Sequence, residues 1–329
     1  MNSSSSTAGA GPVASAPPAV DIEQLTKVFR DFWRRPKVRA VDGLTLRVER
    51  GEVFGLLGPN GSGKSTTIKM LLGLLHPTSG VAHILGQAPS DLGARRRIGY
   101  LPEESHLYRH LTARETLHFY GRLFGLSASE RRRRCDELLD MAGLARAADR
   151  PVGEFSKGMA RRIGLAQALI NDPDLVILDE PTAGLDPVGC RQVKDLMRAL
   201  ARRGRTVLLC THLLSDVEDV CDRIAILYNG RLRACGRITE VLRRQDAVRL
   251  SVPAPGTPEA RDALVEAVRR AAGADPLVEQ PLMPLESFFL RVVREADGRD
   301  ETPSGSESGH PLAPFLNAAG EAPRDGSNP

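Results

Sequence analysis

The stretch GPNGSGKST, residues 58–66, continues the apolar run VFGLL and leads into TTIKMLLGLL, which has the spacing of an amphipathic helix. Glycines let successive backbone N–H groups converge on phosphate oxygens, and the start of the helix adds a positive dipole. Lys64 can reach the β- and γ-phosphates of a nucleotide, and Ser65 can hold Mg²⁺. A glycine-rich turn that binds nothing is the alternative. Because strand, loop and helix occur in this order, we predict a phosphate cradle formed by Gly58, Pro59, Asn60, Gly61, Ser62, Gly63, Lys64, Ser65 and Thr66.

The stretch LVILDEP, residues 175–181, supplies the second half of such a site. Its four apolar residues predict a buried strand that delivers Asp179 to its carboxyl end, where a carboxylate can bind Mg²⁺ directly or through water. Glu180 can then orient or deprotonate an attacking water. An acidic pair alone is typical of a solvated strand end, but a preceding phosphate cradle favours the catalytic interpretation. His212 ends the run TVLLCTH and could contact the γ-phosphate, although a lone histidine is usually structural.

The pattern of apolar runs predicts an α/β fold. LTLRV, residues 44–48, alternates apolar and polar residues, as strands of an antiparallel edge sheet do. VFGLLG, LVILDE and TVLLCTH are nearly continuous runs, as in strands buried on both faces, and they alternate with helical stretches such as RQVKDLMRALARRG. We therefore predict a parallel-sheet core with an antiparallel β subdomain. Asn229-Gly230 predicts a hairpin near its end.

Two further regions differ from this core. Residues from about 104 to 155 are wholly helical in pattern, with capping signals at Thr112–Glu115 and Ser127–Glu130, and they predict an insert of two or three helices. Residues 246–296 contain AVRLSV, EARDALVEAVRRAAG and LESFFLRVVRE, which predict a small α+β appendage. Residues 1–20 and 297–329 are rich in Gly, Pro and Ser, and we expect both to be disordered tails.

Composition narrows the classes of function. The chain has 45 basic and 41 acidic residues, a formal charge of +4, and no basic stripe interleaved with aromatics, so nucleic acid is not an expected partner. No apolar run approaches the roughly 18 residues that span a bilayer, so we do not expect the chain itself to cross a membrane. Five cysteines without a CxxC pair favour unpaired thiols over disulfides or a metal site.

The stretch EFSKGMARR, residues 154–162, indicates a second helix start suited to an anion, because Ser156 and Gly158 precede basic residues. A merely capped amphipathic helix with Met159, Ile163, Ala166 and Ile170 as its core stripe is the other interpretation, and both can hold. Together with the cradle, Asp179, Glu180 and His212, this stretch resembles the nucleotide-binding subunit of an ABC transporter over about residues 21–245. In that family a Leu-Ser-Gly-Gly-Gln signature faces the γ-phosphate held by a partner cassette. FSKGM, residues 155–159, departs from it at three positions but keeps Ser156 and Gly158.

The resemblance implies further site residues. GLDP resembles the family's D-loop and would place Asp186 at the dimer seam. The aromatic residue that stacks on adenine matches Phe29 best, with Trp33 as the rival, and either could instead belong to the core. IGYLPEE occupies the position of the Q-loop, where Glu103 replaces the expected glutamine as a contact for metal and water.

The resemblance also implies a function. YLPEE, SKGM and LESFFLRVV are similar to the branch of ATPases that pair with separate exporter permeases. We expect an ATP- and Mg²⁺-dependent ATPase subunit that works as a homodimer or heterodimer, peripheral to the inner face of the cell membrane. The runner-up is a non-transport ABC ATPase acting on ribosomes, but such proteins generally carry two cassettes in tandem. A DNA-repair ATPase would contain a long coiled coil, and a catalytically dead binding module would be expected to lack Glu180 or His212.

Overall fold

The computed structural model describes residues 16–33, 35–243, 252, 256–273, 275–278 and 312–317. The chain divides into two compact units, and the first comprises residues 1–241 together with residues 303–329. The second unit comprises residues 242–302. Among the described residues no helix is both long and apolar enough to cross a membrane.

The first unit is built around a six-stranded sheet with the order β5-β6-β7-β3-β8-β9. All of its neighbouring pairs are parallel except β8 with β9, which forms the predicted hairpin through Asn229 and Gly230. Every residue of the three central strands β3, β6 and β7 is buried, which explains their continuous apolar sequences. The strands are β3 (Val53–Leu57), β5 (Ile98–Leu101), β6 (Leu175–Asp179), β7 (Thr206–Thr211), β8 (Arg223–Tyr228) and β9 (Arg231–Arg237).

A second, antiparallel sheet has the order β2-β1-β4 and consists of β1 (Val20–Arg30), β2 (Pro36–Val48) and β4 (Ser79–Ile84). Its inward residues share one apolar cluster with β3, β6, β7 and β8 and with α1 (Lys64–Leu71), so α1 packs between the two sheets. The short helix α2 (Leu92–Arg96) precedes β5. The predicted α/β fold with an antiparallel β subdomain is confirmed.

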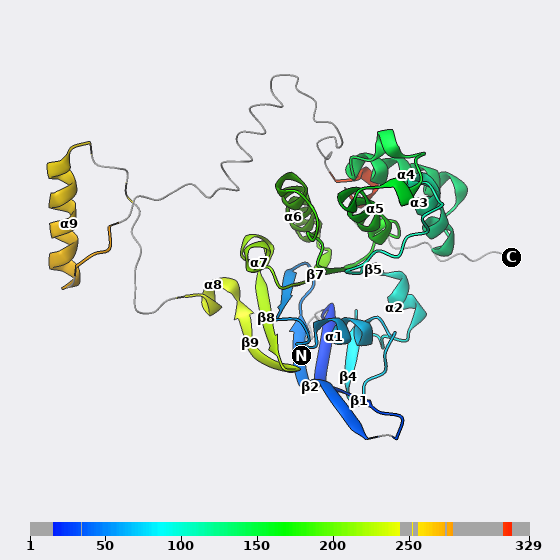
Figure 1. The fold of residues 1–329 in the computed structure, drawn as a ribbon, viewed down its shortest axis with the longest axis horizontal. Helices are drawn as coiled ribbons and strands as arrows, with labels where there is room; N and C mark the ends of the chain where they lie inside the picture. Colours follow the sequence, from blue (N-terminus) through cyan, green and yellow to red (C-terminus); the bar gives the residue numbers. More distant parts are fainter. Residues whose placement is uncertain are drawn as a thin grey trace, which may run out of the picture. The chain divides into compact units, whose positions relative to one another are not determined.

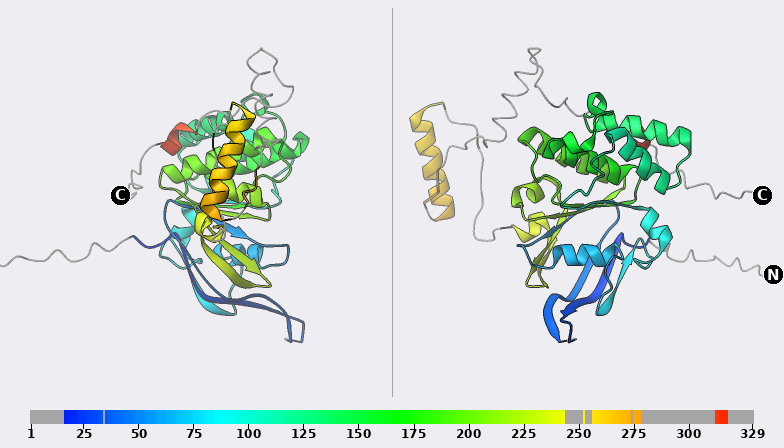
Figure 2. Two further views of the ribbon diagram at one scale, coloured as in Figure 1. Left: turned by 90° about the vertical axis from the view of Figure 1, so that its left-hand side faces the viewer. Right: turned by 45° about the vertical axis from the view of Figure 1, so that its right-hand side comes forward.

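Helices form a second core on the other side of the parallel sheet. The apolar residues of α3 (Ala113–Leu123), α4 (Ala128–Met141), α5 (Lys157–Leu169) and α6 (Pro187–Arg202) belong to one cluster with those of α7 (Leu214–Val220). Figures 1 and 2 show α3, α4 and α5 at the opposite end of this unit from the antiparallel sheet. Short 3₁₀ turns at Ala145–Ala147 and Val152–Glu154 connect α4 to α5, and α8 (Ile238–Val241) follows β9.

The two predicted capping signals have different outcomes. At α3 the Thr112 hydroxyl accepts the Glu115 N–H and the Glu115 carboxylate accepts the Thr112 N–H, so the capping box is complete. At α4 the Ser127 hydroxyl accepts the Glu130 N–H. The Glu130 carboxylate is bound by Arg133 and Arg134 instead, and the second box is only half formed.

The second unit contains α9 (Pro258–Ala272), at the position of the predicted helix. Thr257 caps its start, and Gly273 ends it with a φ of 69°, a conformation that favours glycine. The predicted strand AVRLSV, apart from Val252, and the segment LESFFLRVVRE lie outside the described residues.

Residues 312–317 differ from the expected disordered tail. They include the 3₁₀ turn η3 (Pro314–Asn317), and Leu312, Ala313, Phe315 and Leu316 are buried in the helical core of the first unit. The turn lies beside α4 in Figures 1 and 2. A short apolar cluster inside a polar tail can therefore pack where a suitable surface exists.

Candidate functional site

The glycine-rich loop joins the end of β3 to the start of α1, and its glycines are required by close contacts. A Cβ atom on Gly58 would lie 2.3 Å from the Leu227 carbonyl oxygen, and one on Gly63 would lie 2.5 Å from the Ala40 carbonyl oxygen. Gly63 is the N-cap of α1 with a φ of 105° and provides no side-chain cap. The first N–H groups of α1 can therefore serve an anion.

Lys64 begins α1 and turns back across this loop. Its Nζ donates to the carbonyl oxygen of Gly58 at 2.6 Å and to that of Pro59 at 3.2 Å. The hydroxyl of Ser62 is buried without a hydrogen-bond partner among the described residues. Ser65 is exposed at the same helix start. The loop thus brings together unsatisfied donors and a cation, as a phosphate cradle needs.

Asp179 lies at the carboxyl end of β6, beside the ends of β5 and β7. Burial raises the pKa of its carboxyl to about 6, and the negative charges of Glu103 and Glu180 add to this effect. The positive charges of Lys64 and Arg161 act in the opposite direction. Lys64 and the acidic residues therefore form one electrostatic cluster, as the two sequence motifs predict.

Glu180 follows Asp179 in the left-handed backbone region, with a φ of 50°. One carboxylate oxygen, Oε2, accepts the Thr211 hydroxyl at 2.9 Å. The other, Oε1, accepts the His212 N–H at 3.0 Å and lies 2.7 Å from His212 Nδ1. The carboxylate is buried while 54% of the His212 side chain is exposed. Glu180 is thus held in one orientation by the end of β7.

Glu103 lies in the loop after β5 and is exposed. Its carboxylate is nevertheless close enough to Asp179 to raise the pKa of that carboxyl. Its backbone carbonyl accepts a hydrogen bond from Arg161 at 2.9 Å. The loop is therefore fixed at this residue, while the side chain remains accessible beside the acidic cluster.

Arg161 organises the site, and the sequence analysis did not single it out. Its guanidinium donates to five backbone carbonyls from two loops, those of Pro102, Glu103, Asp179, Glu180 and Pro181. The bond to Glu180 measures 2.6 Å. Burial lowers the pKa of Arg161, and the carboxylates of Asp179 and Glu180 oppose that effect.

This arrangement corrects one detail of the predicted anion site at the start of α5. Arg161 turns inward to the chain's own carbonyls and does not face an external anion. The sequence gives no sign of this, because two adjacent residues of a helix lie about 100° apart and can both lie on its polar face.

Ser156, which is predicted to face an anion, and Asp186, which is predicted to lie at a dimer seam, are found at two adjacent helix starts. Ser156 caps α5 by accepting the Met159 N–H at 3.2 Å, and Asp186 caps α6 by accepting the Gly189 N–H at 2.7 Å. A Cβ on Gly158 would lie 3.6 Å from Leu185, so the two loops are neighbours. Ser156 and Asp186 are exposed. In the described part of the chain, no hydrogen bond links either residue to Lys64, Asp179 or Glu180.

Both candidate adenine-stacking residues are accessible. Phe29, at the end of β1, is 40% exposed, and the Lys27 Nζ lies 5.5 Å from its ring centroid. Trp33 is 72% exposed and packs edge-on against Phe32, with 5.5 Å between ring centroids. The alternative that either residue belongs to the core is therefore wrong, and the choice between them stays open.

Comparisons with known proteins agree with this geometry. Residues 41–183 match the family model described as ABC transporter. The chain is 45% identical over 226 residues to an ABC transporter ATP-binding protein of Synechocystis, covering 68% of this chain and 64% of that relative. It is 43% identical over 243 residues to the Nod factor export ATP-binding protein I of Burkholderia lata, covering 72% of this chain and 78% of the relative.

Solved structures show the same fold. A dimeric ATP-binding cassette in a post-hydrolysis state with ADP and Pi superimposes with a TM-score of 0.62 at 29% identity, covering 67% of this chain and 98% of that one. The ATP-binding subunit of an ABC transporter has a TM-score of 0.61 at 30% identity, covering 84% of this chain and 99% of that one.

Proposed function

The chain belongs to the ABC transporter family of ATP-binding proteins and is an ATPase, and on this premise we propose that it powers export through a separate membrane permease. The observation that carries the ATPase part is the held carboxylate of Glu180 beside Asp179 and Lys64. Export is supported by the similarity to proteins named for Nod factor export. The transported substrate is left open, because selectivity would reside in the permease.

The cradle binds the nucleotide in this mechanism. Backbone N–H groups of residues 60–66 surround the β- and γ-phosphates, and Lys64 exchanges its bonds to the Gly58 and Pro59 carbonyls for bonds to phosphate oxygens. Phe29 or Trp33 stacks on the adenine from β1 or from the loop that follows it. Both rings are accessible enough to do so.

The residues around Asp179 suit Mg²⁺. Burial, and then crowding by two other carboxylates, disfavour the charged form of Asp179, and a hard cation would relieve that crowding. Asp179, the exposed Ser65 hydroxyl and Glu103 offer oxygen ligands of the type that Mg²⁺ takes. When bound there, the ion would neutralise phosphate charge.

Glu180 acts on the attacking water. Its carboxylate, fixed by Thr211 and His212, accepts the water proton or orients the water toward the γ-phosphate. His212 keeps that carboxylate in place and, through its exposed ring, contacts the γ-phosphate. Arg161 holds the backbone of Asp179 and Glu180 against the Glu103 loop, so the acidic residues and this loop move together.

A second cassette completes each site in this proposal. Ser156 and Asp186 are exposed at neighbouring helix starts and lack hydrogen bonds to the nucleotide cradle within the described chain. We infer that Ser156 faces the γ-phosphate bound by the partner and that Asp186 lies at the dimer seam, in a head-to-tail homodimer or a heterodimer with a similar cassette. The dimeric cassette among the structural neighbours supports this arrangement.

The permease would contact the helical insert and the Glu103 loop. Tyr108, Phe119 and Leu123 are exposed on this part of the chain, and the Tyr108 and Phe119 rings pack edge-on with centroids 5.5 Å apart. Such exposed apolar residues favour a protein contact. We accordingly place the protein at the inner face of the membrane, as a peripheral subunit.

Affinity purification of the Glu180→Gln chain from detergent-solubilised membranes, with ATP present, tests the transport proposal. We expect an integral-membrane protein to co-purify, and Tyr108→Ser with Phe119→Ser to reduce its recovery. Recovery of ribosomes without a membrane protein would overturn the transport proposal in favour of the soluble alternative.

A further inference from the structure

The six residues Leu312–Asn317, here called the C-terminal latch, return to the first unit after the second unit in the sequence. Leu312, Ala313, Phe315 and Leu316 are each at most 9% exposed, whereas Pro314 between them is exposed. This degree of burial is typical of core residues. The latch is therefore a packed part of the cassette.

Polar contacts as well as apolar ones hold the latch against α4. The Phe315 N–H donates to the Glu137 carboxylate at 2.7 Å. The Arg134 guanidinium lies over the Phe315 ring, 4.7 Å from its centroid, and also donates to the Ile170 carbonyl at the end of α5 at 2.9 Å. The Phe315 ring therefore contacts Arg134, the side chain that links α4 to the end of α5.

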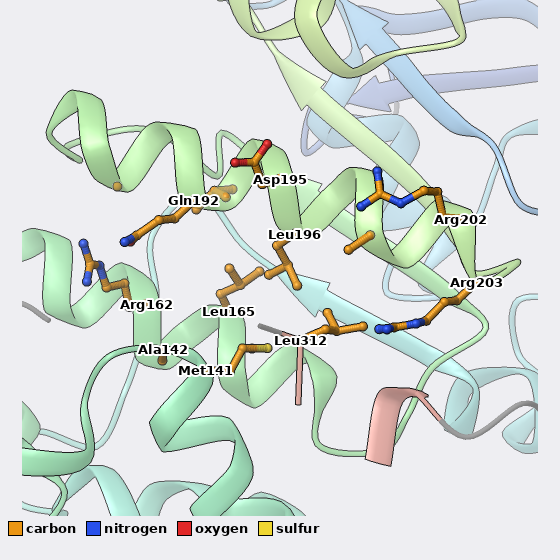
Figure 3. Close-up of a pocket in the computed structure, with 13 residues that line it drawn as sticks. Met141, Ala142, Arg162, Leu165, Gln192, Asp195, Leu196, Arg202, Arg203 and Leu312 are labelled. Atoms are coloured by element: carbon orange, nitrogen blue, oxygen red, sulfur yellow. The ribbon is translucent and has the colours of Figure 1, made fainter. Parts of the chain in front are cut away.

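Leu312 extends the contact toward α6. It lines a groove of about 420 Å³ together with residues of α4, α5 and α6. Figure 3 shows Leu312 among Met141, Leu165 and Leu196, which come from these three helices. Arg162 and Arg203 also line the groove, on opposite sides of Leu312 in Figure 3.

We propose that the latch is a built-in peptide ligand of the α4–α5–α6 surface, and that its docking holds these helices in the arrangement that ATP turnover requires. The second half of the proposal rests on the proposed function, because Ser156 at the start of α5 would act on the partner's nucleotide and Asp186 at the start of α6 would lie at the dimer seam. A latch that joins the three helices fixes the relative positions of those two helix starts.

The first test measures docking in the full chain without nucleotide. The double variant Leu312→Ala, Phe315→Ala should lower Tm by roughly 5 °C or more, since buried apolar side chains are removed. The matched control Leu277→Ala removes an exposed leucine of the second unit and should leave Tm unchanged. Glu137→Ala removes the acceptor for the Phe315 N–H together with the Arg133 ion pair on α4, and it provides a milder variant should the double variant fail to fold. An unchanged Tm in both latch variants would overturn the proposal.

The second test asks whether the latch behaves as a ligand. A synthetic peptide of residues 309–320, added in excess to the folded double variant, should restore Tm and bind with a measurable Kd, while the same peptide with Phe315→Ala should do neither. Failure of the intact peptide to bind would overturn the ligand assignment. A wild-type dimer that forms without ATP and disappears in the double variant would overturn docking within one chain, because it would show exchange of the latch between two copies.

The third measurement addresses turnover separately. The double variant should bind ATP like the wild type but hydrolyse it at least several-fold more slowly, with recovery on adding the peptide. Normal turnover in a destabilised, peptide-rescued variant would overturn the functional half and leave the docking half standing. Tm and peptide binding need no ATP, so a failure of the proposed transport function would not affect them.

Discussion

Nδ1 of His212 lies 2.7 Å from Oε1 of Glu180, and this oxygen also accepts the His212 N–H at 3.0 Å. These bonds form because β6 and β7 are neighbouring parallel strands, whose carboxyl ends meet at one edge of the sheet. The Thr211 hydroxyl holds the other carboxylate oxygen at 2.9 Å. Glu180 is therefore oriented by the end of β7.

Glu180→Gln should bind ATP but hydrolyse it about 10² to 10⁴ times more slowly, because the amide cannot accept the water proton. The amide still has an oxygen for Thr211 or the His212 N–H, so we expect Tm to stay close to that of the wild type. The variant should accumulate as an ATP-bound dimer in size-exclusion chromatography. Glu218→Gln, at an exposed glutamate of α7, is the matched control. Wild-type turnover in Glu180→Gln would show that the carboxylate is not the catalytic group.

Arg161→Ala should cost roughly 2–4 kcal/mol of unfolding free energy, because buried carbonyls of two loops lose their donor. Arg161→Lys should recover only part of this loss, since one ammonium group cannot reproduce the planar set of donors. Urea unfolding of both variants, with the exposed Arg202→Lys as control, measures the effect. Equal stability of the lysine variant and the wild type would mean that only the positive charge matters.

The sequence predicts where the motif residues lie in the fold, because each occupies a fixed place in a strand, loop or helix start. Lys64, Asp179 and Glu180 are examples, since the strands that carry them are recognisable from continuous apolar runs. Arg161 is different, because its partners are backbone carbonyls, and a sequence gives no sign of which carbonyls lack a donor. Arg161 and Arg162 are adjacent, and their side chains leave the helix about 100° apart. A sequence locates the start of a helix only to within one or two residues, so it does not show which of the two faces the core.

The latch and the half-formed cap at Ser127 illustrate the same limit. LAPFL is too short for a periodic signal, and its burial depends on a surface built from three distant helices. At α4, Glu130 has the spacing of a capping box, but Arg133 and Arg134 compete for its carboxylate. The burial of the latch depends on tertiary packing that local patterns do not encode, and the half-formed cap depends on competition between neighbouring side chains that the capping-box spacing alone does not show.

Mixing two inactive chains tests whether Ser156 acts on the partner's nucleotide. A Lys64→Ala chain lacks a working cradle, and a Ser156→Arg chain lacks a working signature, so neither homodimer should turn over ATP. A mixed dimer contains one intact cradle facing an intact Ser156 and should recover activity, provided that a single site can fire. Ser156→Arg also removes the N-cap of α5, at about 1 kcal/mol, so its folding must be checked by Tm.

Ser156→Thr, which keeps a capping hydroxyl, serves as the control for that helix start. Mixed dimers can be verified by two different affinity tags. If mixed dimers are verified but do not hydrolyse ATP, then either Ser156 does not act on the partner's nucleotide or a single site cannot turn over alone.

The negative charge of Glu103 lies close enough to Asp179 to raise the pKa of that carboxyl, while the Glu103 side chain is exposed. If the carboxylate acts near the metal, Glu103→Gln keeps an oxygen for Mg²⁺ or water but loses one negative charge. Hydrolysis should then persist with a higher Mg²⁺ requirement, and Mg²⁺ should increase ATP affinity less than in the wild type.

Glu103→Ala removes the oxygen as well and should lower both turnover and stimulation by the permease. Its backbone carbonyl can still accept from Arg161, so the loop should stay in place and Tm should change little. Turnover and ATP affinity measured over a range of Mg²⁺ concentrations test this role, with Glu104→Gln as the neighbouring control. If Glu103 is only a solvent-facing loop residue, the curves of all the proteins will coincide.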